Sequence, residues 1–421
     1  MIPRPARIEL EGGARIVVAS NPASPFLSFQ GSLPAGVTAE RPGEVGTAGF
    51  LSRLLLSGTR TRTARQIAES LEGLGATLEF DIAQEALVFH GRCTRRTAAK
   101  VFGIVADCLA NPVLPAKEVE RIRAEILTEI EEDMDDTQTQ AVRELLSSVY
   151  PPGHPYGRDP KGDAERVKAI EPTLLLELHD RAYGQQGMIL ALAGDVDTTF
   201  VRTAIAKPLD AVPTGNVPAE SPPNPEPVPP VTKTVALPHK SQVDIAIGLQ
   251  AVPRSHPDFY AASLANLLFG VIGMYGRLGA NVREEKGLAY YSLSRLRALR
   301  HGGHWYILAG VSPDRLGAAM AAIAHELDRL RTEPFTDDEI ESGRLNQIGG
   351  LAVRLDRNAE VANTFHDIEF HGLGLDFLER YPGIVKALTR DATIAAAERY
   401  FRKRDCSVAI AGPLPGEVPS L

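Results

Sequence analysis

The segment His366-Asp-Ile-Glu369-Phe-His371 contains the residue types of a hydrolytic zinc site. Such a site needs neutral histidine nitrogens as ligands and a carboxylate that takes a proton from metal-bound water. In a helix His366 and Glu369 could share a face, but the extra residue before His371 turns that side chain by about 100° around the axis. Two groups do not make a metal site, so we expect none here.

Other chemically suggestive segments also have simpler interpretations. His301 and His304 flank a Gly-Gly pair, which is typical of an exposed hairpin turn. The acidic run 129–136 predicts a solvated end of a helix, although recognition of a partner there is conceivable. The chain contains no G-x-S-x-G nucleophile turn and no P-loop pattern.

Composition excludes several classes of function. The 421 residues carry a net charge of −8, so no basic excess indicates binding to nucleic acid or to an anionic membrane. The longest apolar runs fall short of the ~20 residues of a membrane span, and no signal peptide is visible. The three cysteines, Cys93, Cys108 and Cys406, form no CxxC pair and are expected to be buried. We therefore expect a cytoplasmic protein, or a periplasmic one if a leader has been removed.

The elements that position any site fall into two halves. Residues 213–230 contain eight prolines in eighteen positions, which predicts a semi-rigid linker. A proline-rich ligand for a partner is the alternative. This boundary gives an N-terminal domain of residues 1–212 and a C-terminal domain of residues 231–421.

The two halves resemble each other. The helix start at 114–123 recurs at 335–344. The segment 188–196, an apolar run that ends at Gly194 followed by two further residues, recurs at 406–414. We expect an α+β fold with two tandem homologous domains. Each should be a mostly antiparallel sheet covered by helices on one face. The predicted strands are 15–19, 77–80, 87–91, 188–194, 243–249, 289–296, 305–311 and 406–412, and the predicted helices are 46–56, 64–74, 95–110, 172–183, 260–269, 313–330 and 391–401.

The segment 44–59, EVGTAGFLSRLLLSGT, resembles the zinc-binding helix of the insulinase and pitrilysin peptidase family, whose pattern includes H-x-x-E-H. On that frame the two histidines fall on Gly49 and Arg53, and the catalytic glutamate falls on Ser52. Glycine has no donor, a guanidinium does not coordinate zinc and serine is a poor base. We therefore expect no cofactor in this chain. Glu129 matches the family's third ligand, and alone it is expected to be a relic or a surface acid.

Two further segments carry the same resemblance. Residues 154–157, HPYG, match a loop that is structural in the family, so His154 is not expected to be a ligand. Residues 276–290, GRLGANVREEKGLAY, match the family string that carries an Arg–Tyr pair, here Arg283 and Tyr290. In active members this pair faces the zinc site of the other half, where a phenol can stabilise an oxyanion and a guanidinium can bind a carbonyl or carboxylate. The alternative is that Arg283 pairs with a nearby acid and Tyr290 only packs; Tyr291 should point to the opposite face.

The resemblance implies the non-zinc subunit of a heteromeric zinc metallopeptidase. A homologous partner with an intact His-x-x-Glu-His motif would hold the zinc. This chain, inactive alone, would contribute Arg283 and Tyr290 to the hydrolysis of short peptides in a closed chamber. The alternative is a catalytically inert structural or binding protein with the same fold, like the core subunits of respiratory complexes. A self-sufficient homodimeric peptidase would need zinc ligands that the sequence lacks.

Overall fold

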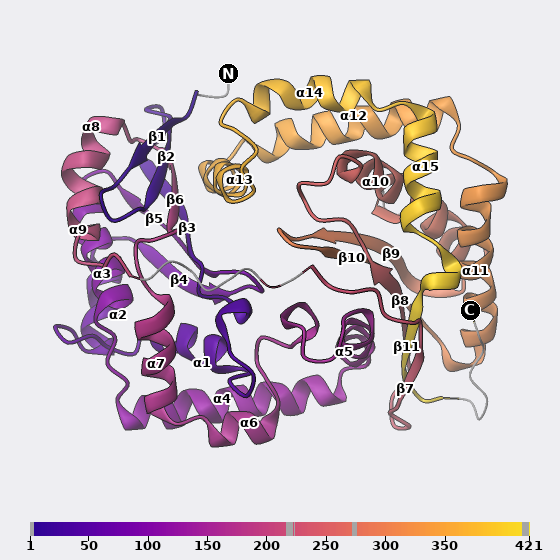
Figure 1. Cartoon of the computed structure of the whole chain (residues 1–421), viewed down its shortest axis with the longest axis horizontal. Helices are drawn as coiled ribbons and strands as arrows, with labels where there is room; N and C mark the ends of the chain where they lie inside the picture. The colour runs from indigo at the N-terminus through magenta and orange to yellow at the C-terminus, as the bar shows by residue number, and fades with distance from the viewer. Residues whose placement is uncertain (1–3, 216–221, 223, 272–275, 415–420) are drawn as a thin grey trace. The chain divides into compact units, whose positions relative to one another are not determined.

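The computed structural model describes residues 4–215, 222, 224–271, 276–414 and 421 (Figure 1). The chain divides into two compact units, each built around one sheet. Unit 1 contains residues 1–130, 158–221 and 351–379, and unit 2 contains residues 131–157, 222–350 and 380–421.

Unit 1 contains a six-stranded sheet with the order β1-β2-β6-β3-β5-β4. Neighbouring strands are antiparallel except for β2 and β6, which run parallel. All six residues of β6 are buried, as expected for a continuous apolar run in the middle of a sheet. The strands are β1 (Ala6–Glu9), β2 (Arg15–Ser20), β3 (Phe26–Leu33), β4 (Thr77–Ile82), β5 (Leu87–Thr94) and β6 (Ile189–Gly194).

A layer of helices covers one face of this sheet and encloses the main hydrophobic core. Helix α2 begins with a capping box in which Thr63 and Gln66 exchange side-chain and backbone hydrogen bonds. The helices are α1 (Thr47–Leu54), α2 (Ala64–Gly73), α3 (Ala98–Ala110), α4 (Ala116–Asp135, in unit 1 as far as Ile130), α6 (Ala164–Ala169), α7 (Pro172–Ala182), α8 (Thr198–Phe200) and α9 (Lys207–Leu209), with the shorter or irregular turns η1 (Val37–Ala39) and η3 (Val201–Ala206).

Unit 2 contains a five-stranded sheet with the order β7-β11-β8-β10-β9. Apart from β1, this order repeats that of unit 1, including the single parallel pair, here β7 with β11. The repeat supports the prediction of two homologous sheets. The strands are β7 (Thr232–Ala236), β8 (Val243–Gln250), β9 (Ala289–Ala298), β10 (Gly303–Val311) and β11 (Ser407–Gly412).

Helices also cover this second sheet, around a core that contains Trp305 and Phe401. Their residues belong to unit 2, except that α12 continues past Gly350 and α14 begins before Arg380. The elements are α10 (Phe259–Asn266), η4 (Leu267–Val271), η6 (Gly279–Glu285), α11 (Leu316–Thr332), α12 (Asp337–Arg354), α14 (Phe377–Ala387) and α15 (Arg390–Tyr400), with the 3-10 turns η2 (Pro155–Gly157), η7 (Pro313–Arg315) and η8 (Lys403–Asp405).

Each sheet also has a helix on its second face, so the expectation that helices cover one face only was wrong. In unit 1 that helix is α13 (Asn358–Phe370), which lies beside the sheet (Figure 1). The Nε2 atom of its His366 lies 2.8 Å from the Ser32 hydroxyl of β3. In unit 2 it is α5 (Thr137–Val149), which shares a hydrophobic cluster with Ala246 and Leu308 of the sheet. The physical reason is that strands buried along their whole length, such as β6 and β11, need cover on both faces.

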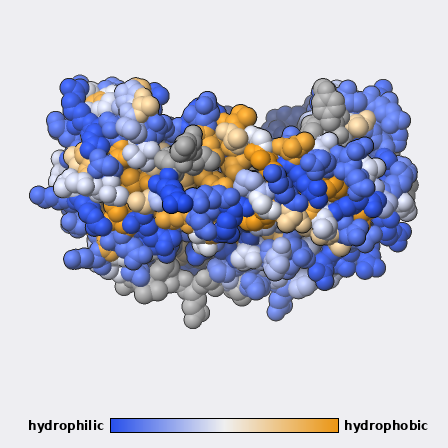
Figure 2. Space-filling view, turned by 90° about the horizontal axis from the view of Figure 1, so that it is seen from above, coloured by the Kyte–Doolittle hydropathy of each residue, from blue (hydrophilic) through white to orange (hydrophobic). Residues whose placement is uncertain are grey.

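The predicted domain bounds 1–212 and 231–421 stay a prediction. Of the predicted linker, residues 216–221 and 223 lie outside the described residues. All three cysteines are free and buried, as predicted. Within the described part of the chain, no helix combines the length and hydrophobicity that crossing a membrane requires. Figure 2 shows hydrophilic residues over much of one face, with hydrophobic residues exposed between them.

Candidate functional site

Helix α1 carries the positions that match the family's zinc ligands, and its packing leaves little space for larger residues. Gly49 and Ser52 are both buried, and the Ser52 hydroxyl donates a hydrogen bond to the Gly49 carbonyl oxygen at 2.8 Å. A Cβ atom added at Gly49 would lie 2.3 Å from the carbonyl oxygen of Pro160. Because this neighbour is backbone, a histidine could enter here only if the 158–162 segment moved.

Arg53 and Glu129 are brought together by α1 and α4. The guanidinium donates two hydrogen bonds to the carboxylate, Nη1 to Oε1 at 2.6 Å and Nη2 to Oε2 at 2.7 Å. This fork geometry is the strongest form of an arginine–carboxylate pair. Hydrogen bonding to Arg53 holds the pKa of Glu129 below its usual value, and the same contact raises the pKa of Arg53. The resemblance places both residues on ligand positions of one zinc site although they are 76 positions apart, but their ion pair was not predicted.

This set of side chains does not fit a zinc ion. The one carboxylate at these positions, that of Glu129, is already paired with the guanidinium of Arg53. Among the described residues, no group of three or more His, Cys, Asp or Glu side chains could hold a metal. In the His366–His371 segment, Glu369 is bonded to Arg7 and paired with Arg15, so both of its oxygens serve the packing of α13 on the sheet.

His154 also lies in a structural setting. Its ring stacks on Tyr150, with centroids 5.4 Å apart, and its Nδ1 accepts a hydrogen bond from the backbone N–H of Tyr156. The Tyr150 hydroxyl in turn lies 2.9 Å from His304 Nδ1 on β10. These contacts attach the 154–157 loop to the sheet of unit 2 and agree with the structural interpretation of this loop.

Glu40 is a buried acid that sequence reasoning missed. Its Oε1 accepts hydrogen bonds from the backbone N–H groups of Gly46 at 3.0 Å and Ala48 at 2.9 Å, at the start of α1. Its Oε2 is buried and has no hydrogen-bond partner among the described residues. Burial, with a smaller contribution from the charge of Glu44, raises the pKa of Glu40 to about 7. The only sequence signal was an acid shortly before an apolar helix.

Arg283 lies near the end of the π-helical turn η6 in unit 2. Two residues earlier, the Asn281 amide donates a hydrogen bond to Glu326, whose side chain is fully buried on α11. After η6, Arg315 donates a hydrogen bond to the carbonyl oxygen of Gly287 at 2.7 Å. The Arg283 side chain itself is 45% exposed and has an ion pair with Glu284, Nε to Oε1, at 3.6 Å. The turn is therefore anchored on both sides of a guanidinium that stays open to solvent.

Tyr290 occupies an irregular position at the start of β9. Gly310 pairs with Tyr291 and Val311 pairs with Ala289, so Tyr290 is the extra residue of a β-bulge. Bulges redirect side chains, and the Tyr290 side chain is 61% exposed, with its hydroxyl 3.0 Å from that of Ser312. The bulge was not predicted, because it depends on the partner strand.

Tyr291 faces away from Tyr290, as the alternation of strand side chains predicts. Its hydroxyl donates a hydrogen bond to Asp244, a fully buried acid on β8 that also accepts a hydrogen bond from Thr137 of α5. Burial, together with this carboxylate, raises the pKa of the Tyr291 phenol. Tyr291 therefore fixes the start of β9 to the sheet and leaves Tyr290 as the phenol open to solvent.

Two family profiles match the chain. The profile described as "Insulinase (Peptidase family M16)" matches residues 15–159, and the one described as "Peptidase M16 inactive domain" matches residues 169–346. Similar proteins include an "uncharacterized zinc protease" of Mycobacterium tuberculosis, 26% identical over 97% of this chain and 93% of the relative. Another protein of that description, from Streptomyces coelicolor, is 24% identical over 97% of this chain and 89% of the relative.

Solved structures share the fold. One described as a peptidase M16 inactive domain from Pseudomonas fluorescens superimposes with a TM-score of 0.89 at 23% identity, covering 99% of this chain and 100% of that one. A protease from Helicobacter pylori superimposes with a TM-score of 0.91 at 18% identity, covering 98% of this chain and 100% of that one. The predicted fold class of two helix-covered sheets in tandem is confirmed.

Proposed function

Because this chain belongs to the insulinase family, peptidase family M16, we propose that it is the non-zinc subunit of a heteromeric zinc metallopeptidase. One observation carries the proposal: the position that holds zinc in the family is occupied by the Arg53–Glu129 ion pair. A chain with that replacement has no means of activating water through its own metal. It can still contribute groups to an active site that another chain completes.

Arg283 and Tyr290 are the groups we propose for that role. Both side chains are partly or largely exposed, and the segment between them is anchored through Gly287. A phenol held by an anchored strand can donate a hydrogen bond to the carbonyl oxygen of a peptide as negative charge develops on it. A guanidinium can bind a neighbouring carbonyl or carboxylate of the same substrate. Neither role requires a metal in this chain.

The proposed partner is a homologous subunit with an intact His-x-x-Glu-His motif, and it would supply the zinc and the general base. Relatives described as zinc proteases make such a subunit a reasonable partner. The proposed substrates are short peptides, admitted to a chamber too small for folded proteins. We propose the cytoplasm as the compartment, because the three thiols are free and buried.

A second candidate is an inert structural or binding protein with this fold. The observation that favours it is that Arg283 and Tyr290 each have a local partner, Glu284 and Ser312. These local contacts would be enough to hold Arg283 and Tyr290 in place if neither side chain took part in catalysis.

Purification of the native complex, with metal analysis of each separated chain, tests the proposal. We expect one zinc in the partner, none in this chain, and peptide cleavage only when both are mixed. A variant of the partner with its motif glutamate changed to glutamine is the matched control and should be inactive in the mixture. Cleavage by the partner alone at the same rate would instead support the inert protein, and zinc held by this chain would contradict both candidates.

A further inference from the structure

Strands β4 and β9 occupy equivalent places at the edges of the two sheets and carry opposite charges. Edge strand β4 of unit 1 exposes Glu79 and Asp81, which lie 3.6 and 3.5 Å from the His90 ring nitrogens. Edge strand β9 of unit 2 exposes Arg295 and Arg297. In each strand the two charged residues are two positions apart, so they lie on the same face.

The charge of β9 is not neutralised locally. The sequence from 286 to 313 contains Lys286 and three arginines but no aspartate or glutamate, in a chain whose net charge is −8. Neither Arg295 nor Arg297 has an ion pair or a hydrogen bond through its side chain with any described residue. The positive charge of Arg297, in addition to the larger effect of burial, lowers the pKa of the neighbouring His304 to about 4.

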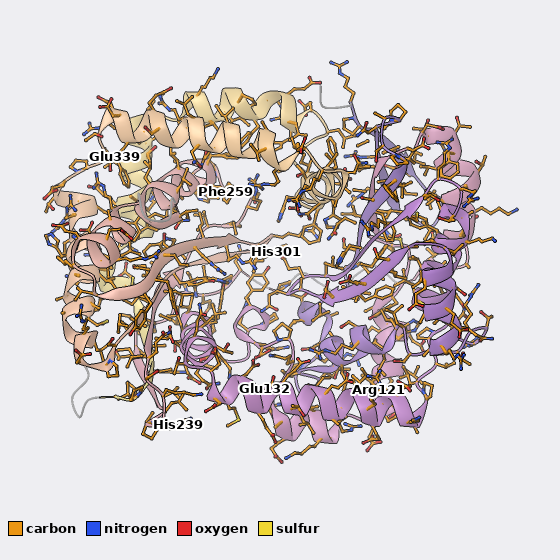
Figure 3. The ribbon with its side chains drawn as sticks, turned by 180° about the vertical axis from the view of Figure 1, so that it is seen from behind. Arg121, Glu132, His239, Phe259, His301 and Glu339 are labelled. Carbon is orange, nitrogen blue, oxygen red and sulfur yellow. The ribbon has the colours of Figure 1, made fainter. Side chains whose placement is uncertain are left out.

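The outer edge of β9 has no strand neighbour in the part of the chain that the structure describes, and at Ser294 it is approached by Gly270 of η4, so the free stretch of the edge lies beyond Ser294 toward Arg297. Among the described residues, β9 is hydrogen-bonded to β10 and to no other strand. Ser294 faces the larger helical layer, and its hydroxyl bonds to Asn266, whereas Arg295 and Arg297 lie on the opposite face, where α5 packs against Ala246 and Leu308 of other strands. The strand runs on to the hairpin tip labelled by His301 (Figure 3). An unpaired edge of this kind presents a row of backbone donors and acceptors to an extended chain.

We propose that the outer edge of β9 binds an extended peptide segment with acidic residues at alternate positions. Backbone hydrogen bonds would add the segment to the sheet as a strand. Carboxylates two residues apart would then stand opposite Arg295 and Arg297, and opposite charges in this cross-strand position stabilise pairing. Adjacent acidic residues would place only every second carboxylate on the arginine face.

This inference rests on the proposed function in one respect, namely that peptides are the substrates. Tyr290 precedes Arg295 by five residues on the same strand, which corresponds to about 16 Å at the usual strand rise. The acidic segment would therefore lie about five residues from the peptide bond that Tyr290 contacts. The site would select peptides by charge at a distance from the bond that is cleaved.

Binding of a fluorescein-labelled peptide of alternating glutamate and threonine to the full purified chain, measured by fluorescence anisotropy, tests the proposal without any peptidase activity. Two comparison peptides are an isomer with its glutamates in one block and a peptide of alternating lysine and threonine. The double variant Arg295→Glu/Arg297→Glu should weaken binding of the alternating acidic peptide by about tenfold. It should also gain affinity for the lysine peptide.

The matched control is Arg202→Glu/Arg354→Glu, which changes the net charge equally at two exposed arginines elsewhere. It should bind the alternating acidic peptide as the unaltered chain does, and circular dichroism should show that both variants are folded. Equal weakening in the control would mean that net charge, and not β9, attracts the peptide. Equal binding of the block isomer, or no binding to the unaltered chain, would also overturn the proposal. None of these results depends on whether the mixed complex cleaves peptides.

Discussion

The α1–α4 region of unit 1 and the η6–β9 region of unit 2 differ in how their charged and polar groups are satisfied. In the first, Arg53 and Glu129 neutralise each other and the packing at Gly49 admits no larger residue. In the second, internal bonds hold the backbone while Arg283 and Tyr290 project into solvent. Closed packing stabilises a fold, whereas an anchored backbone with open side chains is suited to binding. This difference is the reason that we propose a contribution to an active site for the second region and not for the first.

The largest effect is expected from Tyr290→Phe, which removes the open phenol and keeps the ring. If the hydroxyl stabilises an oxyanion, kcat of the mixed two-subunit peptidase should fall by about 10²–10³-fold. Steady-state kinetics with a short peptide measures this change. Ser312→Ala is the control, because it removes the hydroxyl's partner and leaves the phenol, and it should change kcat little. An unaltered kcat in Tyr290→Phe would show that the Tyr290 hydroxyl has no catalytic role, and the second region would then differ from the first only in exposure.

The next effect concerns the buried acid at the start of α1. The pKa of Glu40 is raised from 4.5 to about 7, so the folded chain keeps a proton that the unfolded chain releases between these values. The free energy of unfolding should therefore decrease as pH rises from 4.5 to 7, by up to about 3 kcal/mol from this group. Urea unfolding at several pH values should show a flatter dependence for Glu40→Gln than for the unaltered chain. Parallel pH curves would mean that this carboxyl is ionised in the folded chain.

A smaller effect is expected from the ion pair itself. Arg53→Met keeps the apolar stem and leaves Glu129 without its partner, which should reduce the free energy of unfolding by about 1–2 kcal/mol because the pair is partly exposed. Glu129→Gln should cost a similar amount, and the double variant less than the sum of both. Urea unfolding of all four proteins measures the coupling. If the losses in free energy of unfolding of the two single variants add up in the double variant, Arg53 and Glu129 do not stabilise each other. If either single variant greatly lowers the activity of the mixed peptidase, the pair is not purely structural. Either result would contradict the contrast drawn between the two regions.

Much of the fold could be predicted because it is encoded locally. The apolar runs ending at Gly194 and Gly412 indicated the central strands β6 and β11, and their recurrence indicated two related sheets. Strand β3 was missed, because Ser28, Gln30 and Ser32 interrupt its apolar pattern. The packing of α13 and α5 on the second faces was missed because the contacts join segments far apart in the chain.

The candidate site shows the same limit. Matching of short segments identified Gly49, Ser52, Arg53, Glu129, Arg283 and Tyr290 as positions of interest, and their roles stay a proposal. The bidentate geometry of Arg53 and Glu129 and the bulge at Tyr290 depend on the relation of α1 to α4 and of β9 to β10. Such relations are set by tertiary packing and leave no mark in residue spacing.

The packing of α13 against the first sheet has a consequence for how the polypeptide becomes stable. During translation, α13 is made after all strands of the unit 2 sheet except β11. Until then, the face of the unit 1 sheet on which α13 packs has no helix to cover it. A protein cut within its proline-rich stretch would leave its leading fragment without this cover. The complete packing of unit 1 therefore depends on a helix that is made after most of unit 2.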